Sequence, residues 1–248
     1  DFCLSRGLGD VYKRQLKGSD LTCLRGLRHS PSPQGSPFRP SPHEVVSRHG
    51  GRAAVSVGGF TAGDNRPEPA FSTMKVPLGI AALRQNPAFY PDVEAAVTRS
   101  DNAAAHRLFA QVPAAAYAGV IAEAGSQTTI PAAYQMGTLW TTRDLANFAS
   151  GIRCVAGHEP VVEMMGRIVD YQRWGMGRIP GSRYKGGWNY HEGGHLARQF
   201  GLIPGPQGDI AVAITAYSPR GHQGSFAMLD ELAGGVAALS PQLPVARC

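Results

Sequence analysis

The sequence predicts an α+β fold in which helices pack on one antiparallel sheet. A strand-like segment at 52–57 comes early, and a long helical region follows it. Near the end, segments at 184–190, 195–203 and 210–217 are apolar or alternating over strand lengths, with glycine- and proline-containing turns between them. Consecutive strands joined by short turns form an antiparallel meander. A closing helical pattern at 226–239 completes an element order typical of helices packed on a sheet.

Composition favours one domain with a full core. The chain has 248 residues, of which 43% are hydrophobic. Its net charge of +6 is scattered, without a long basic run or basic residues interleaved with aromatic ones. Such a surface suits an anionic cell envelope and does not predict nucleic-acid binding. No apolar run is long enough to span a membrane, so we expect no integral membrane segment, and we expect a monomer.

The first 40 residues differ from the rest. Residues 5–15 resemble the translation of a transposon-end adapter used in sequencing libraries, so 1–15 are expected to be an artefact foreign to the fold. The natural start is then missing, and the lack of a signal peptide says nothing about export. Residues 16–40 are rich in Pro and Ser without periodicity, which predicts a disordered linker. The folded domain is expected at 41–248.

Local patterns predict the elements in order. Ser41-Pro42-His43-Glu44 is a capping box with proline at the first helical position, which predicts a short helix. The strand at 52–57 is expected to end at Gly58-Gly59, and 61–69 reads as a loop. Helical patterns follow at 72–86, 92–98, 103–110, 114–124, 141–148 and 161–171. The pattern at 141–148 begins with a threonine cap, Thr141.

The helix predicted from Ser72 carries a possible nucleophile and its base. Ser72 is placed to cap the helix, and Lys75 lies one turn further on the same face. A serine hydroxyl needs a base beside it, and a lysine desolvated in an apolar pocket can become that base. The helix N-terminus favours a developing negative charge. Alone, a Ser-x-x-Lys motif occurs by chance in many chains, and a serine there is usually only a cap.

Two further motifs follow in order. Ser100-Asp101-Asn102 interrupts two helical patterns, and Lys185-Gly186-Gly187 begins a strand near the end. Each triplet is weak alone. Together with Ser72-x-x-Lys75, on a helix, a helix break and a strand, the set resembles the penicillin-recognising serine enzymes, above all the class A β-lactamases. The resemblance covers about 41–239 and implies a fold like that of β-lactamases and DD-peptidases.

The resemblance implies catalytic roles for three residues. Ser72 would attack the carbonyl of a β-lactam, amide or ester, Lys75 would take its proton, and Ser100 would relay a proton to the leaving nitrogen. Asn102 would hydrogen-bond the substrate's side-chain amide. The expected reaction is acyl transfer through a serine hydrolase mechanism, and Asp101 is expected to cap a helix by accepting backbone N–H groups.

The third motif would bind substrate along a strand. The resemblance implies that Lys185 helps to hold a substrate carboxylate, with Gly186 and Gly187 beside it. The backbone N–H groups of Ser72 and Trp188 would form the oxyanion hole, and losing one such donor typically lowers the rate about a hundredfold or more. The ring of Trp188 could line the cleft or belong to the core.

Two departures from class A predict slow deacylation. A glutamate between the second and third motifs of those enzymes activates the water that releases the acyl group. The corresponding region here, 124–140, holds no Asp or Glu; Gln135 cannot act as a base, and Glu163 belongs to a later helix. Gly186 stands where the family has a hydroxyl, so one carboxylate contact is lost.

Other segments resemble a branch of exported actinobacterial serine hydrolases. They are Tyr134-Gln135-x-Gly137-Thr138-x-Trp140, Gln172-Arg173-Trp174-Gly175, and Lys185-Gly186-Gly187-Trp188 followed by Arg198-Gln199. This resemblance implies a secreted or cell-envelope protein acting on a small-molecule or peptidoglycan-type substrate. The alternative is a catalytically degenerate penicillin-fold binding module. The missing glutamate favours that alternative, and the retained motif residues argue against it.

A zinc site is a weaker alternative. His191-Glu192-Gly193-Gly194-His195 matches the zinc-protease pattern, which needs both histidines on one helical face. The adjacent glycines predict a hairpin turn instead, so we expect no metal and no other cofactor. The four cysteines are widely spaced without a Cys-x-x-Cys motif, which excludes a zinc ribbon and leaves any disulfide pairing open.

Overall fold

The computed structural model describes residues 37–127 and 135–248. The expected adapter segment 1–15, most of the expected linker 16–40 and much of the 124–140 region lie outside the described residues. Among the described residues, no helix is long and apolar enough to cross a membrane.

The core of the fold is a five-stranded antiparallel sheet in the order β2-β1-β7-β6-β5. The strands are β1 (Arg52–Val57), β2 (Phe60–Gly63), β5 (Arg183–His191), β6 (Gly194–Gly205) and β7 (Gly208–Ser218). The predicted meander is therefore confirmed, and the predicted early strand pairs with its last member, β7. The strand that carries the third motif, β5, lies at one edge of the sheet.

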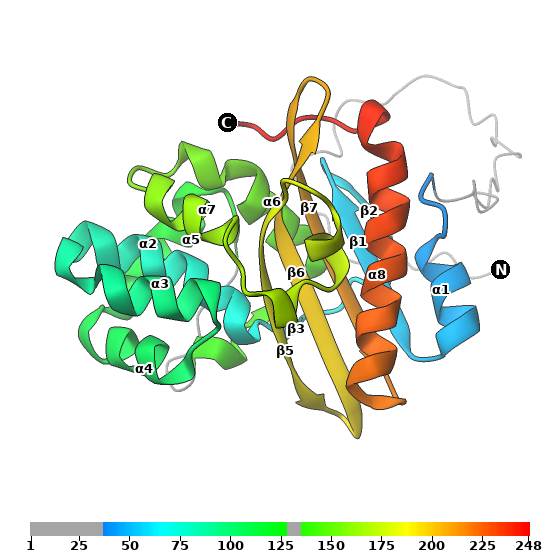
Figure 1. Cartoon of the computed structure of the whole chain (residues 1–248), viewed down its shortest axis with the longest axis horizontal. Helices are drawn as coiled ribbons and strands as arrows, with labels where there is room; N and C mark the ends of the chain where they lie inside the picture. The colour runs from blue at the N-terminus through cyan, green and yellow to red at the C-terminus, as the bar shows by residue number, and fades with distance from the viewer. Residues whose placement is uncertain (1–36, 128–134) are drawn as a thin grey trace, which may run out of the picture. The chain divides into compact units, whose positions relative to one another are not determined.

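Helices cover both faces of the sheet, which confirms the α+β prediction (Figure 1). On one face lie α1 (Pro42–His49) and the long α8 (Gly221–Leu239). The other side carries α2 (Lys75–Gln85), α3 (Tyr90–Thr98), α4 (Asn102–Gln111), α5 (Ala114–Glu123), α6 (Thr142–Gly151) and α7 (Glu159–Met165).

Two apolar cores lie on the two sides of the sheet. Side chains of successive strand residues point to opposite faces. On β6, Phe200 therefore joins the core under α2–α7, whereas Ala197 joins the core under α8. On β7, Ala213 belongs to the core under α2–α7 and Ile214 to the core under α8. The same alternation decides on which face of the sheet each side chain of β5 lies.

Capping was predicted correctly at α1 and α6. The Ser41 N–H donates to Glu44 Oε2 at 2.6 Å, and Ser41 Oγ accepts from the Glu44 N–H at 3.3 Å, which completes the capping box. Thr141 Oγ1 accepts from the Asp144 N–H at 3.1 Å. Each bond satisfies an amide that the first helical turn leaves without a partner.

Two predictions at element boundaries were wrong. Gly58 and Gly59, with φ of 53° and 84°, form a hairpin turn, so the expected loop 61–69 contains β2 and the short β3 (Glu68–Pro69), which pairs with β4 (Leu139–Trp140). The helix expected over 161–171 begins at Glu159 and ends at Met165, followed by a separate 3₁₀ turn, Asp170–Gln172. Gly166 follows its last residue, where a helix commonly stops.

A disulfide joins Cys154 to Cys248, residues 94 positions apart in sequence. The sequence left the pairing of the cysteines open. The bond ties the C-terminal end to the segment that follows α6. The Arg247 N–H next to it donates to Ser150 O at 3.0 Å, which fixes the last residues against that helix.

Candidate active site

Ser72 lies in a 3₁₀ helix, η1 (Phe71–Met74), that leads directly into α2. The prediction that Ser72 caps an α-helix was wrong, because α2 begins only at Lys75 and its cap position is Met74. In a 3₁₀ helix, side chains three residues apart eclipse one another, so Ser72 and Lys75 share one side. Phe71, immediately before Ser72, has a φ of 48°, a conformation that is rare for a residue with a side chain.

Lys75 joins the first motif to the second. Its ammonium, fully buried, donates to Ser100 O and to Asn102 Oδ1, both at 2.6 Å. Burial lowers the pKa of Lys75 to about 8, while the carboxylate of Asp101 acts in the opposite direction. Because of this lowered pKa, a substantial fraction of Lys75 is neutral near pH 8. Within the described part of the chain, Ser72 Oγ and Lys75 Nζ form no hydrogen bond with each other.

The second motif bends the chain between α3 and α4. Ser100 has a φ of 58°, and Asp101 caps α4 by accepting the Ala104 N–H at Oδ1 at 2.8 Å. That hydrogen bond is the main reason why the pKa of Asp101 is lowered. Asp101 therefore has the capping contact expected of it, and Asn102 is the first residue of α4.

Lys185 joins the third motif to the second. It is fully buried on β5, and its ammonium donates to Ser100 Oγ and, at 3.0 Å, to Gly186 O. Burial lowers the pKa of Lys185 well below its usual value, and the nearby charge of Lys75 adds to this. Ser100 is thus held by both lysines, through its carbonyl by Lys75 and through its hydroxyl by Lys185.

Gly187 brings β5 against Ser72. A Cβ atom at Gly187 would lie 2.7 Å from Ala70 O and 2.9 Å from the Ser72 nitrogen, closer than real Cβ contacts allow. Only glycine permits this approach of two backbones. The residues named by the three motifs therefore converge: Ser72 and Lys75 from η1 and α2, Ser100 and Asn102 from the α3–α4 junction, and Lys185 and Gly187 from β5.

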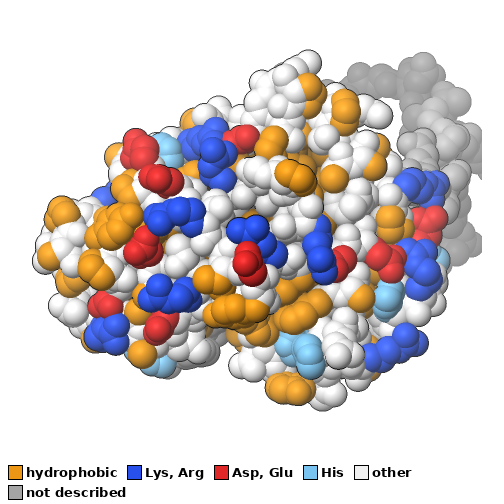
Figure 2. All heavy atoms as spheres, in the orientation of Figure 1, with side chains coloured by type: hydrophobic (Ala, Val, Ile, Leu, Met, Phe, Trp, Pro, Cys, Tyr) orange, Lys and Arg blue, Asp and Glu red, His pale blue; other side chains and the backbone are white. Residues whose placement is uncertain are grey.

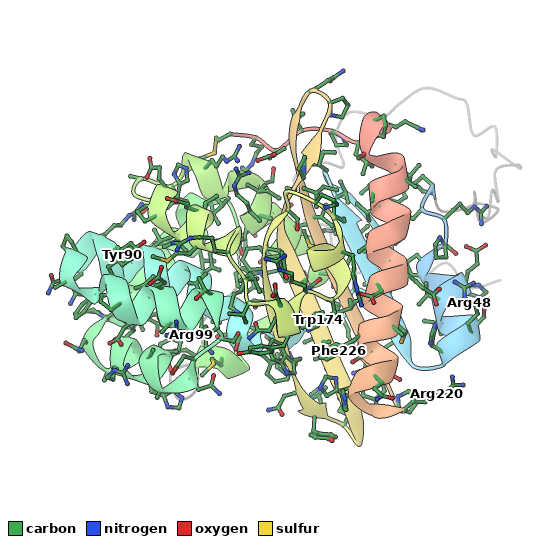
Figure 3. The ribbon with its side chains drawn as sticks, in the orientation of Figure 1. Arg48, Tyr90, Arg99, Trp174, Arg220 and Phe226 are labelled. Carbon is green, nitrogen blue, oxygen red and sulfur yellow. A yellow bond between two sulfur atoms is a disulfide. The ribbon has the colours of Figure 1, made fainter. Side chains whose placement is uncertain are left out.

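Gly186, on the opposite face of β5, is covered by an indole. A Cβ atom there would lie 2.9 Å from Trp174 Cη2. The Trp174 ring stacks on Phe226 of α8, with centroids 4.3 Å apart and an interplanar angle of 13° (Figure 3). Half-buried Trp188 meets Trp174 edge-on at 5.4 Å. Sequence reasoning missed this covering role of Trp174, because the contact joins segments with no local pattern in common.

Two buried polar residues of β6 hold the segments on either side of the site. Arg198 donates to Glu68 O at 2.7 Å and to Trp140 O at 2.8 Å, which ties β3 and β4 to the sheet. Burial lowers the pKa of Arg198 to about 10, and the charge of Glu68 opposes this. Gln199 donates to Trp174 O and accepts from the Met176 N–H, both at 2.7 Å. An Arg-Gln pair within a buried strand is the sequence feature that could have revealed these contacts.

The zinc-protease pattern lies on a hairpin, as the glycines predicted. β5 and β6 pair through it, and Glu192 and Gly193 have φ of 48° and 77°. His191 Nε2 lies 3.2 Å from Glu68 Oε2, whereas His195 Nδ1 lies 2.7 Å from Ser225 Oγ. The two histidines therefore have separate partners. In 37–127 and 135–248, no group of three or more His, Cys, Asp or Glu side chains is placed to hold a metal ion.

The region where class A enzymes carry their glutamate is described only at its two ends. Gln135 begins a short 3₁₀ turn, Gln135–Gly137, that contacts η1, and residues 128–134 lie outside the described part. Glu163 is exposed on α7.

Comparison with solved structures identifies the architecture. The TLA-3 extended-spectrum β-lactamase superposes with a TM-score of 0.65 at 15% identity, over 78% of this chain and 94% of that chain. A β-lactamase from Sphaerobacter thermophilus superposes with a TM-score of 0.63 at 19% identity, over 81% and 96%. The chain has the class A β-lactamase fold. A β-lactamase from Chitinophaga pinensis gives a TM-score of 0.63 at 14% identity, over 77% and 95%.

The sequence matches no protein-family model and no curated protein. Identities below 20% support the β-lactamase-like serine hydrolase fold and leave the chemistry to be argued from the residues of this chain.

Proposed function

We propose that this chain is a serine hydrolase that forms an acyl-enzyme at Ser72. The observation that supports this most strongly is the hydrogen bonding of Ser100, whose carbonyl accepts from Lys75 and whose hydroxyl accepts from Lys185. Three motifs far apart in sequence thereby share one polar site beside Ser72. Burying two lysines next to each other is unfavourable, so the arrangement calls for a reason other than stability.

The proposed chemistry follows from these positions. Ser72 Oγ attacks a carbonyl carbon, and its proton passes to the neutral amine of Lys75. The N–H groups of Ser72 and Trp188 stabilise the oxyanion of the tetrahedral intermediate. As the carbon–nitrogen bond breaks, Ser100 gives its proton to the leaving nitrogen and is reprotonated from a neighbouring lysine. The product of this half-reaction is an ester of Ser72.

Release of the acyl group is proposed to be slow. Hydrolysis of the ester needs a base that activates water, and no Asp or Glu occurs anywhere in 124–140. Lys75 could serve as that base only in its neutral form. The acyl-enzyme is therefore expected to accumulate when acylation is faster than release.

The proposed substrates are β-lactams or related amides and esters, including peptidoglycan-type peptides, for which no cofactor is needed. We propose that the protein acts as a monomer in the secreted or cell-envelope compartment and that it does not bind nucleic acid. Asn102 and the strand from Lys185 to Trp188 would position the substrate beside Ser72.

A catalytically degenerate binding module is the second candidate. One observation favours it: Lys75 Nζ is hydrogen-bonded to Ser100 O and Asn102 Oδ1 rather than to Ser72 Oγ. A module of this kind would bind a penicillin-like ligand without forming a covalent bond.

An intact-mass time course with benzylpenicillin tests the proposal, with Ser72→Ala as the control. We expect the mass of the wild type to rise by the mass of one penicillin and to return slowly, while Ser72→Ala stays unmodified. Rapid loss of the drug without a lasting adduct would contradict slow deacylation. If neither an adduct nor drug loss occurs with penicillin or with simple activated esters, the binding module is the better account.

A further inference from the structure

An aromatic pocket lies along the edge strand β5, on the α8 side and next to the candidate active site. It is lined by Trp188, Asn189, Tyr190, His195, His222 and Phe226, and its volume is about 270 Å³. Trp188 connects the two regions, because its backbone directly follows Gly187, whose Cβ position is 2.9 Å from the Ser72 nitrogen, while its ring lies on the α8 side of β5. A strand rises about 3.3 Å per residue, so Tyr190 lies roughly 10 Å beyond Gly187. A substrate held at Ser72 can span that distance.

The rings that line the pocket are held in place by one another. Phe226 is stacked on Trp174, and the His195 ring meets the Phe226 ring edge-on at 5.5 Å. The ring centroids of His222 and Phe226 lie 6.0 Å apart, and Tyr190 meets His195 edge-on at 5.8 Å. Figure 2 shows hydrophobic and histidine side chains gathered on one part of the surface, over the lower ends of β5 and α8. Rings fixed in this way lose little freedom when a ligand binds.

The side chains that line the pocket are aromatic rings and one amide, with no Asp, Glu, Lys or Arg among them. His195 is buried, and burial together with His222 lowers its pKa, so it stays neutral. The nearest strand positions add no cation: Gly186 has no side chain and is covered by Trp174, and the guanidinium of Arg198 is buried against backbone carbonyls. An ammonium ion would lose its hydration here without meeting an acidic side chain of the lining.

We propose that this pocket binds an uncharged aromatic group of the substrate, and that it selects phenyl-bearing amides and esters over their cyclohexyl counterparts. That the aromatic group belongs to a substrate rests on the proposed acyl transfer at Ser72. That the pocket binds an aromatic ring does not depend on it. A cavity of about 150 Å³ already accommodates benzene, so this pocket has room for one ring. Its exposed ring edges and faces offer the edge-to-face and offset-stacked contacts that aromatic pairs prefer.

A titration of Ser72→Ala with phenylacetamide and cyclohexylacetamide, followed by tryptophan fluorescence, tests the pocket without chemistry. We expect phenylacetamide to bind more tightly. Phe226→Leu and the exposed His222→Ala should each weaken its binding about three- to tenfold, which corresponds to the loss of an aromatic contact. Tyr90→Leu, which removes a partly exposed ring at the far end of the helical layer (Figure 3), should leave the affinity unchanged. Equal affinity for both amides, or tighter binding of tetramethylammonium or N-acetylglucosamine, would overturn the proposal.

A kinetic comparison on the wild type separates this proposal from the proposed function. The probes are the trifluoroethyl esters of phenylacetic and cyclohexylacetic acid, whose leaving group has no ring. A faster reaction of the phenylacetyl ester at Ser72 supports both proposals. If neither ester reacts while phenylacetamide binds as expected, the pocket is supported and the proposed function fails. If both esters react equally and phenylacetamide does not bind preferentially, the pocket is overturned and the proposed function stands.

Discussion

The two faces of β5 differ in chemistry although their residues alternate along one strand. On the face toward α2 and α4, Lys185 reaches Ser100 and Gly187 meets the backbone at Ser72. On the face toward α8, Gly186 is covered by Trp174 and the Trp188 ring joins the aromatic cluster. The two-residue period of an edge strand can therefore separate a polar reaction centre from an apolar binding pocket on the two faces of one strand.

The polar face depends on Lys75 as the base, and replacing it should have the largest effect. Lys75→Met keeps a long side chain in the buried space and removes the amine. General bases typically contribute 10²- to 10⁴-fold, so the rate of adduct formation at Ser72 should fall by about that factor. Intact-mass time courses measure it. Arg48→Met, on α1 beyond the sheet (Figure 3), is the matched control. Adduct formation at the wild-type rate in Lys75→Met would exclude Lys75 as the base.

Adding one methyl group to each face of β5 compares the faces directly. In Gly187→Ala the new atom meets the Ala70 carbonyl and the Ser72 amide, which belong to the backbone. Displacement of a catalytic group by about 1 Å can lower a rate 10²-fold, so acylation should fall by about that much. In Gly186→Ala the new atom crowds the Trp174 ring and lies at ordinary contact distance, 3.7 Å, from Gln199 Cγ; overpacking of this kind destabilises by about 1–3 kcal/mol.

Both glycine variants are compared by acylation rate and by thermal unfolding. The aromatic preference in the pocket should change in Gly186→Ala and persist in Gly187→Ala. The reverse pattern would show that the assignment of the two faces is wrong.

Arg198 is expected to affect stability more than chemistry. It is fully buried, and Arg198→Met leaves the carbonyls of Glu68 and Trp140 without their donor. Buried acceptors that lose a charged partner typically destabilise a protein by 1–3 kcal/mol each, so we expect a loss of about 3 kcal/mol in the free energy of unfolding. Urea denaturation measures it. An unchanged midpoint would mean that the desolvation of the guanidinium already offsets these bonds.

The smallest effect is expected from the charge of Asp101. Acylation should rise with pH through about 8, because only the neutral amine of Lys75 accepts a proton. Asp101→Asn keeps a good helix cap and removes the carboxylate that raises the pKa of Lys75. The pH profile of the acylation rate should therefore move to lower pH. A shift to higher pH would contradict the placement of Asp101 near Lys75.

Local patterns predicted most of the fold because its elements carry regular periods. The strands of the meander and the capped helices α1 and α6 follow from alternation and from capping residues. β2 was missed because Gly58-Gly59 can end a strand or turn it into a hairpin. The 3₁₀ start at η1 was missed because Ser72 also suits an α-helix cap.

The site was predictable where spacing along the chain sets the geometry, as for Ser72 and Lys75. The order of the three motifs along the chain led to the expectation that Ser100 and Lys185 belong to the same site. The covering of Gly186 by Trp174 depends instead on packing between a loop, β5 and α8, which no local pattern encodes. The same holds for Arg198, whose partners lie on β3 and β4.

Peptide mapping of the acyl group tests whether Ser72 is the nucleophile. The protein is stopped in acid during turnover of benzylpenicillin and digested with trypsin. Because trypsin does not cleave between Arg66 and Pro67, one peptide, 53–75, contains Ser72, and fragmentation places the adduct within it. We expect the acyl group on Ser72 alone. Modification of another serine, or of Lys75 or Lys185, would contradict it.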